Sequence, residues 1–101
     1  MKSFRVTLTL ANTNYNLYTL IAAIMPTFYD QGRQVMIQSD TANSDAVLIG
    51  DSNLSATVYG INLAAALASV NLGSAPLMVR LHDYYARSAT AGQILEITVI
   101  Y

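Results

Sequence analysis

The chain is characterised first by what it lacks. It has no cysteine, no tryptophan and one histidine, and only 11% of its 101 residues are charged. The absence of cysteine excludes a disulfide scaffold and thiolate metal ligands. The formal net charge is −1 and the five lysine and arginine residues are scattered, so we expect no nucleic-acid binding. With so few groups for proton transfer or metal binding, we expect neither an enzyme nor a resident cofactor.

Long hydrophobic runs are also missing. The longest apolar segment, residues 20–26, is much shorter than the roughly 20 residues that are needed to cross a bilayer. The first residues differ from a secretory signal peptide, because Arg5 and nearby threonines interrupt the apolar pattern. We therefore expect that the protein is synthesised in the cytoplasm and does not associate with a membrane.

Apolar residues nevertheless make up 53% of the chain, and they alternate with polar residues in many short segments. A period of two with β-branched residues is typical of half-buried strands. By this criterion we expect strands at residues 4–10, 33–39, 46–50, 57–63, 67–72, 77–82, 84–88 and 93–101. Such short strands, separated by turn residues, favour one mainly β domain over residues 1–101. We expect an antiparallel β-sandwich of the jelly-roll or Greek-key type.

One segment near the N-terminus has helical spacing instead. Its apolar stripe consists of Leu17, Leu20, Ile21, Ile24 and Met25. This stripe predicts one short α-helix over residues 17–25, ended by Pro26 and covering an open end of the sheet core. Because alanine at residues 64–66 favours helix, an α+β fold with a second helix through residues 61–70 is the alternative. Ala91 and Gly92 predict a hairpin turn before the last strand.

Residues 50–54 (GDSNL) are one insertion away from the Gly-Asp-Ser-Leu signature of a hydrolase family. That chemistry requires a histidine base held by an acid, and His82 is the only histidine in the chain. We therefore interpret this segment as a polar turn and assign no catalytic residue. His82 also lacks a second histidine or a cysteine for a metal site.

Four acidic or amide residues could gather oxygens around a calcium ion: Asp40, Asn43, Asp45 and Asp51. Their spacing differs from that of an EF-hand loop, which also needs a central glycine and a terminal glutamate. Asp and Asn in such segments usually form turns. We favour turn formation and assign no metal ligand.

Tyrosine is unusually frequent, with seven residues: Tyr15, Tyr18, Tyr29, Tyr59, Tyr84, Tyr85 and Tyr101. Its apolar ring and polar hydroxyl suit a surface that is covered by another protein. The low charge also gives little repulsion between copies, so we expect a homo-oligomer. Tyr84 and Tyr85, flanked by Arg80 and Arg87, are our candidate centre of an interface.

Three runs resemble small structural proteins of tailed bacteriophages, the capsid decoration or cement proteins: residues 33–38 (RQVMIQ), 47–55 (VLIGDSNLS) and 86–93 (ARSATAGQ). The resemblance covers residues 33–101. It implies a β-sandwich that forms trimers or other oligomers on the head of the virion and binds the major capsid protein. Alanine at residues 64–66 departs from the glycine or proline that is usual in such a connection. The resemblance identifies no individual functional residue.

These observations together lead us to expect a capsid decoration protein that self-associates and stabilises the phage head. A related hypothesis places the chain in the tail, the neck or the base of a head fibre. A third, of a different class, is a carbohydrate-binding β-sandwich module. Such modules usually present an exposed aromatic platform, often tryptophan, and this chain contains no tryptophan.

Overall fold

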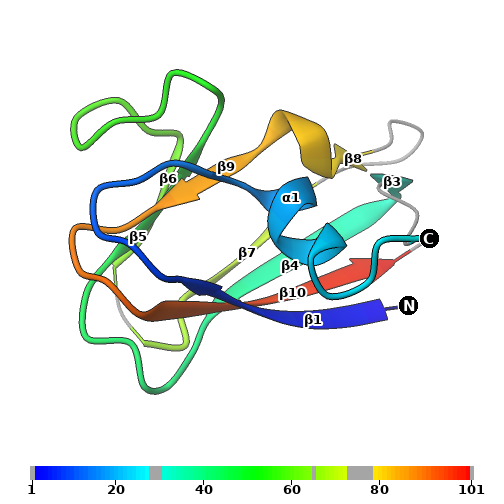
Figure 1. Ribbon diagram of the computed structural model, residues 1–101, viewed down its shortest axis with the longest axis horizontal. Coiled ribbons are helices and arrows are strands. Elements are labelled where there is room, and N and C mark those ends of the chain that lie inside the picture. The colour runs from blue at the N-terminus through cyan, green and yellow to red at the C-terminus, as the bar shows by residue number, and fades with distance from the viewer. Residues whose placement is uncertain (1, 28–30, 65, 73–78, 101) are drawn as a thin grey trace.

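The computed structural model of the protein describes residues 2–27, 31–64, 66–72 and 79–100. Within these segments the chain is mainly β and forms two four-stranded antiparallel sheets and one two-stranded sheet (Figure 1). Sheet A has the strand order β1 (Lys2–Leu8), β10 (Gln93–Ile100), β4 (Gln34–Ser39) and β7 (Ser69–Leu72). Sheet B has the order β2 (Tyr15–Asn16), β9 (Tyr85–Arg87), β5 (Val47–Gly50) and β6 (Ile61–Leu63).

The remaining regular elements are short. Sheet C pairs β3 (Gln31–Gly32) with β8 (Val79–Arg80). The α-helix α1 (Leu17–Ala22) follows β2, and the 3-10 helix η1 (Leu81–Asp83) follows β8. β2 and β3 could not be predicted from the sequence, because two-residue strands leave no periodic pattern.

The alternating pattern of the sequence accounts for the core. In β10, Leu95, Ile97 and Val99 are fully buried, while Glu96 and Thr98 on the opposite face are partly exposed. The inward residues of β1, β4, β5, β6 and β9 alternate in the same way, and those of both large sheets belong to one hydrophobic cluster. The two sheets therefore enclose a single core, and each keeps an outer face.

The strand pairing follows a simple rule. Each strand pairs with its mirror image in chain order: β1 with β10, β2 with β9, β3 with β8, β4 with β7, and β5 with β6. The chain thus resembles one long antiparallel ribbon whose tip is the loop between β5 and β6. Two further pairs, β10 with β4 and β5 with β9, complete the large sheets.

The helix is shorter than the apolar stripe predicts. The Asn16 side chain accepts a hydrogen bond from the Thr19 N–H at 3.2 Å and caps the first turn. Leu17 and Ile21 are buried in the core, but the helix ends at Ala22 and Ile24 is 56% exposed. The helix contacts β1 of sheet A and β2 of sheet B, so it covers an opening between the two sheets (Figure 1).

Several predicted strands are shorter in the structure. The strand expected over residues 57–63 is confined to β6, because the Ser55 hydroxyl accepts hydrogen bonds from the Thr57 and Val58 N–H groups and holds a turn there. The strand expected over residues 77–82 becomes β8 and η1, and its first two residues lie outside the described residues.

One expectation about connections is wrong, and one alternative is not realised. The alternative, a second helix through residues 61–70, is absent from the described residues of this segment, which form β6 and the start of β7, as the favoured strands predict. Ala91 and Gly92 do not form a hairpin, because β9 belongs to sheet B and β10 to sheet A. The turn crosses between the sheets, with Gly92 at φ 84° and its N–H bonded to the Leu8 carbonyl at 2.8 Å.

Candidate functional site

The four residues that the sequence proposed for an interface follow one another along β8, η1 and β9. Arg80 is exposed in β8. Tyr84 directly follows η1 and packs against the hydrophobic core. Tyr85 and Arg87 flank the buried Ala86 in β9, so their side chains lie on the outer face of sheet B. The structure therefore brings Tyr85 and Arg87 together and places Tyr84 on the opposite side.

Strand register extends this pair into a surface. Tyr85 lies opposite Asn16 of β2, and Arg87 lies opposite Leu48 of β5, which in turn is opposite Asn62 of β6. We call these five residues the sheet B face. Leu48, Tyr85 and Arg87 are all partly exposed. The Arg87 guanidinium donates a hydrogen bond to the Asn14 Oδ1 at 3.4 Å, which holds it along the sheet.

The other tyrosines have separate surroundings. The Tyr15 hydroxyl accepts a hydrogen bond from the Leu10 N–H at 2.9 Å and anchors the loop after β1. Tyr18 of α1 stacks on His82 of η1, with ring centroids 3.7 Å apart and an interplanar angle of 20°. Tyr59 is exposed in the loop before β6. Tyr29 and Tyr101 lie outside the described residues.

The segment that resembles the hydrolase signature is built as a turn. The Asp51 carboxylate accepts a hydrogen bond from the Asn53 N–H at 2.8 Å, and the Asp51 carbonyl accepts one from the Leu54 N–H at 3.0 Å. Ser52 is exposed at the centre of this turn, whereas His82 stacks against α1. This arrangement shows no nucleophile–base pair between them.

The acidic residues considered for calcium are also turn residues. Asp45 accepts hydrogen bonds from the Thr90 hydroxyl at 2.7 Å and from the Ala46 N–H at 2.7 Å, and these bonds lower the pKa of Asp45. Across the described ranges, no group of three or more His, Asp or Glu side chains could hold a metal ion. The described residues also contain no helix of the length and apolarity that a membrane span requires.

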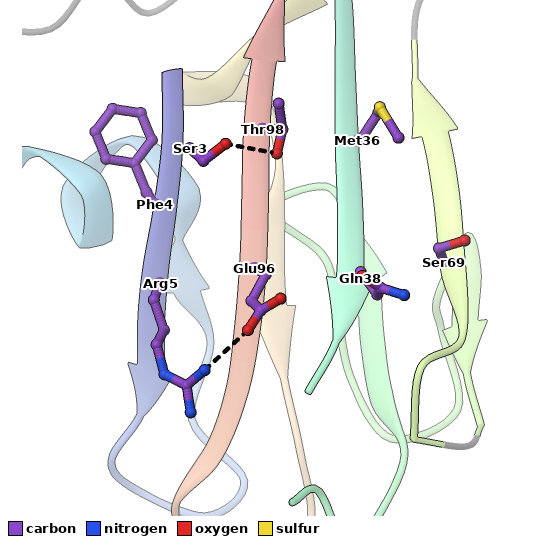
Figure 2. Close-up of a pocket in the computed structure, with 8 residues that line it drawn as sticks. All are labelled: Ser3, Phe4, Arg5, Met36, Gln38, Ser69, Glu96 and Thr98. Atoms are coloured by element: carbon purple, nitrogen blue, oxygen red, sulfur yellow. Dashed lines mark hydrogen bonds and ion pairs between the residues drawn. The ribbon is translucent and has the colours of Figure 1, made fainter. Parts of the chain in front are cut away.

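A second surface, which the sequence analysis missed, is a cavity of about 340 Å³ on the outer face of sheet A (Figure 2). Two rows of side chains cross the strands here. Ser3, Thr98 and Met36 form one row, and Arg5, Glu96, Gln38 and Ser69 form the other. We call this the sheet A cavity. Phe4 also borders it, but its buried ring points to the other side of β1.

Arg5 organises one side of this cavity. Its Nη1 atom donates to Glu96 Oε1 at 2.8 Å and to Asp40 Oδ1 at 2.9 Å, so one guanidinium links two carboxylates. The Ala42 N–H, which donates to the Asp40 carboxylate at 3.0 Å, lowers the pKa of Asp40, and Arg5 acts in the same direction. Arg5 and Glu96 each alternate with buried residues of their own strand, but this alternation does not indicate that the two are neighbours.

The comparisons add no relative. Comparison with known protein families, with curated protein sequences and with solved structures gives no match.

Proposed function

We propose that the protein is a capsid decoration protein of a tailed bacteriophage, which forms homo-oligomers such as trimers and binds the major capsid protein. The observation that carries the proposal is the sheet B face. Tyrosine and arginine are enriched at the centres of protein interfaces, and here Tyr85 and Arg87 are adjacent on a surface built from regular strands. This face needs no loop rearrangement to meet a partner.

The fold supports the same proposal. We infer that the two sheets form a β-sandwich of the jelly-roll type, because nested strand pairs describe a ribbon that is folded over on itself. When β3 and β8 are left out, the remaining eight strands make two sheets of four, as in a jelly roll. Jelly rolls occur in viral capsid proteins, but also in lectins and cupins, so the fold alone does not assign the function.

The charge content is also consistent with a covered surface. The chain carries charge on 11% of its residues, against about a quarter in typical soluble domains. Weak repulsion between copies favours assembly on a repeating lattice, where many weak contacts give lasting attachment. The phage context is proposed from the resemblance of residues 33–101 to decoration proteins, and with it we propose a location in the virion after assembly in the host cytoplasm.

Binding to phage heads tests the proposal. Purified protein is mixed with heads assembled without it, and bound protein is measured by co-sedimentation. We expect saturable binding, and we expect Tyr85→Ala to weaken it about tenfold or more. Met36→Ala, on the outer face of sheet A, serves as the matched control and should bind like the wild type. Circular dichroism and the unfolding midpoint show that both variants fold.

The copy number per particle separates the related hypotheses. Hundreds of copies indicate the head shell, whereas a dozen or fewer indicate the tail, the neck or the base of a head fibre. A protein that sediments as a monomer at micromolar concentration and does not bind heads would contradict the proposal.

A further inference from the structure

We propose that the sheet A cavity binds a neutral, polyhydroxylated ligand of the size of one or two sugar rings. This inference concerns the face opposite the sheet B face and does not depend on a role in the virion. It rests on four properties of the cavity, namely its size, its hydrogen-bonding groups, its charge and its rigidity.

The size and position suit a small ligand. The volume of about 340 Å³ lies near the lower end of the range of about 300–1,000 Å³ that is typical of ligand sites. The depression exists because Ser3, Thr98 and Ser69 have short side chains, while the longer Arg5 and Gln38 rise beside them. Figure 2 shows these groups on one side of the sheet, with Met36 next to them.

The cavity offers both donors and acceptors. Ser3 Oγ and Thr98 Oγ1 share one hydrogen bond at 3.1 Å. Each hydroxyl has one donor and two acceptor positions, so the pair retains one O–H and several lone pairs for a ligand. Gln38 donates through Nε2 to the Leu67 carbonyl at 3.3 Å, which fixes the orientation of its amide. Vicinal hydroxyl groups, which both donate and accept, match this mixture.

The charge of the site disfavours anions. One guanidinium, that of Arg5, faces the two carboxylates of Asp40 and Glu96, so this cluster has a net charge of −1. A phosphate, sulfate or carboxylate would meet a positive group that is already neutralised. A neutral ligand is not repelled by the two carboxylates, and its hydroxyl groups can still donate to the carboxylate of Glu96.

The remaining contacts indicate a modest affinity. Met36 is 40% exposed, and its thioether side chain can pack against the C–H face of a ring. No aromatic ring lines the described cavity except that of Phe4, which points into the core. We therefore expect a dissociation constant of roughly 1 mM. The Arg5 bridges tie β1 to β10 and to the residue after β4, so the site is formed before the ligand arrives.

Titration followed by NMR tests this proposal on the full chain. The ¹⁵N-labelled protein is titrated with the methyl glycosides of glucose, galactose and mannose, and with N-acetylneuraminic acid as an anionic probe. We expect saturable amide shifts with at least one neutral glycoside, concentrated in β1, β10 and β4. The anionic sugar should bind at least about tenfold more weakly, because of the cluster charge.

Two variants and one control locate the site. Thr98→Val keeps the shape of the side chain but removes its hydroxyl, and Gln38→Leu removes the amide. Each should weaken binding about tenfold. Thr7→Val, on the same face of β1 but outside the cavity, should bind like the wild type. Unfolding midpoints verify that all three variants fold.

Other results would overturn the proposal. These are the absence of a saturable shift with every neutral glycoside, shifts concentrated outside sheet A, or equal losses in Thr7→Val and Thr98→Val. Preferred binding of N-acetylneuraminic acid would also contradict it, because the argument from charge would then be wrong. None of these results bears on head binding through Tyr85, so the two proposals can fail independently.

Discussion

At the scale of single residues, the most informative backbone conformation is that of Leu67. Among the described residues, Leu67 and Asn12 are the only non-glycine residues with positive φ, at 65° and 53°. Asparagine adopts this conformation readily, but leucine does so at a cost of about 1 kcal/mol or more. The Leu67 N–H donates to the Ser39 carbonyl at 2.9 Å, so tertiary hydrogen bonding holds the strained residue in place.

Leu67→Gly should therefore stabilise the protein. Leu67 is 55% exposed, so glycine removes the strain and loses little packing. We expect a gain of up to about 1 kcal/mol, reduced in part by the greater freedom of glycine in the unfolded chain. Urea unfolding measures the change. Asn12→Gly is the control, and its midpoint should stay near that of the wild type. A lower stability of Leu67→Gly would show that the leucine side chain stabilises the fold by more than the backbone strain destabilises it.

Asp40 gives a second prediction at this scale, for the dependence of stability on pH. Hydrogen bonding by the Ala42 N–H lowers the pKa of Asp40 in the folded protein below its ordinary value of 3.8, and Arg5 acts in the same direction. The unfolded chain therefore takes up the proton first as the pH falls. The contribution of Asp40 to stability is complete above pH 3.8 and is lost as the pH falls through its folded pKa.

Asp40→Asn removes this titration and tests its effect. We expect the variant to be less stable than the wild type at neutral pH and to lose less stability on acidification. Urea midpoints measured from about pH 2 to about pH 7 give the comparison. Parallel curves for the two proteins would show that Asp40 does not contribute to the acid sensitivity.

At the scale of elements, α1 shows where a periodic pattern overstates a helix. The stripe continues to Ile24 and Met25, but the structure ends the helix at Ala22. The Ile24 and Met25 N–H groups both bond to the Ile21 carbonyl at 2.9 Å, which marks the closing turn. Beyond Ala22, Ile24 is exposed, whereas Met25 is partly buried and packs against the core without extending the helix.

Truncation of two stripe residues distinguishes these roles. Leu17 is fully buried, so Leu17→Ala should destabilise the protein by about 2–5 kcal/mol. Ile24 is 56% exposed, so Ile24→Ala should change stability by no more than about 0.5 kcal/mol. Thermal unfolding monitored by circular dichroism measures both. Similar losses in the two variants would show that Ile24 is covered, for example by a second copy of the chain.

The strands themselves could largely be predicted from the sequence, but their partners could not. Alternation identified β4 and β10 and the faces of Ile37 and Ile97, because burial of one face imposes a period of two. It contains no information on which strands are neighbours. The sheet A cavity depends on Ser3 lying opposite Thr98 and Arg5 lying opposite Glu96, more than 90 residues away in each case. The sequence therefore indicates Tyr85 and Arg87 as candidates but does not indicate this cavity.

At the scale of the whole molecule, the nested pairing brings the two ends of the ribbon together. Lys2 of β1 lies opposite Val99 of β10, and Figure 1 shows the start of β1 and the end of β10 at the same end of the molecule. The tip of the ribbon, residues 51–60, is mostly exposed. A new chain break is therefore expected to be tolerated at the tip, provided that the old ends are joined.

A circular permutant tests this description of the fold. Its ends are joined by a short glycine–serine linker, and the chain is opened between Ala56 and Thr57, both of which are exposed. We expect a strand-rich circular dichroism spectrum and a cooperative transition within about 10 °C of the wild type. A permutant opened between Ile37 and Gln38, inside β4, should not fold. If both permutants fold equally well, the assignment of β4 to an interior position in sheet A is wrong.

The same nesting has a consequence for protein synthesis. β5 and β6 can pair as soon as both have left the ribosome, but β1 waits for β10, which is synthesised after the other nine described strands. Until β10 has been made, β4 lacks this neighbour, and the unpaired backbone N–H and C=O groups at this strand edge can pair with other chains. A product that terminates before residue 93 should consequently aggregate in the cell and not persist as a partly folded species, which makes the synthesis of β10 the step that completes sheet A.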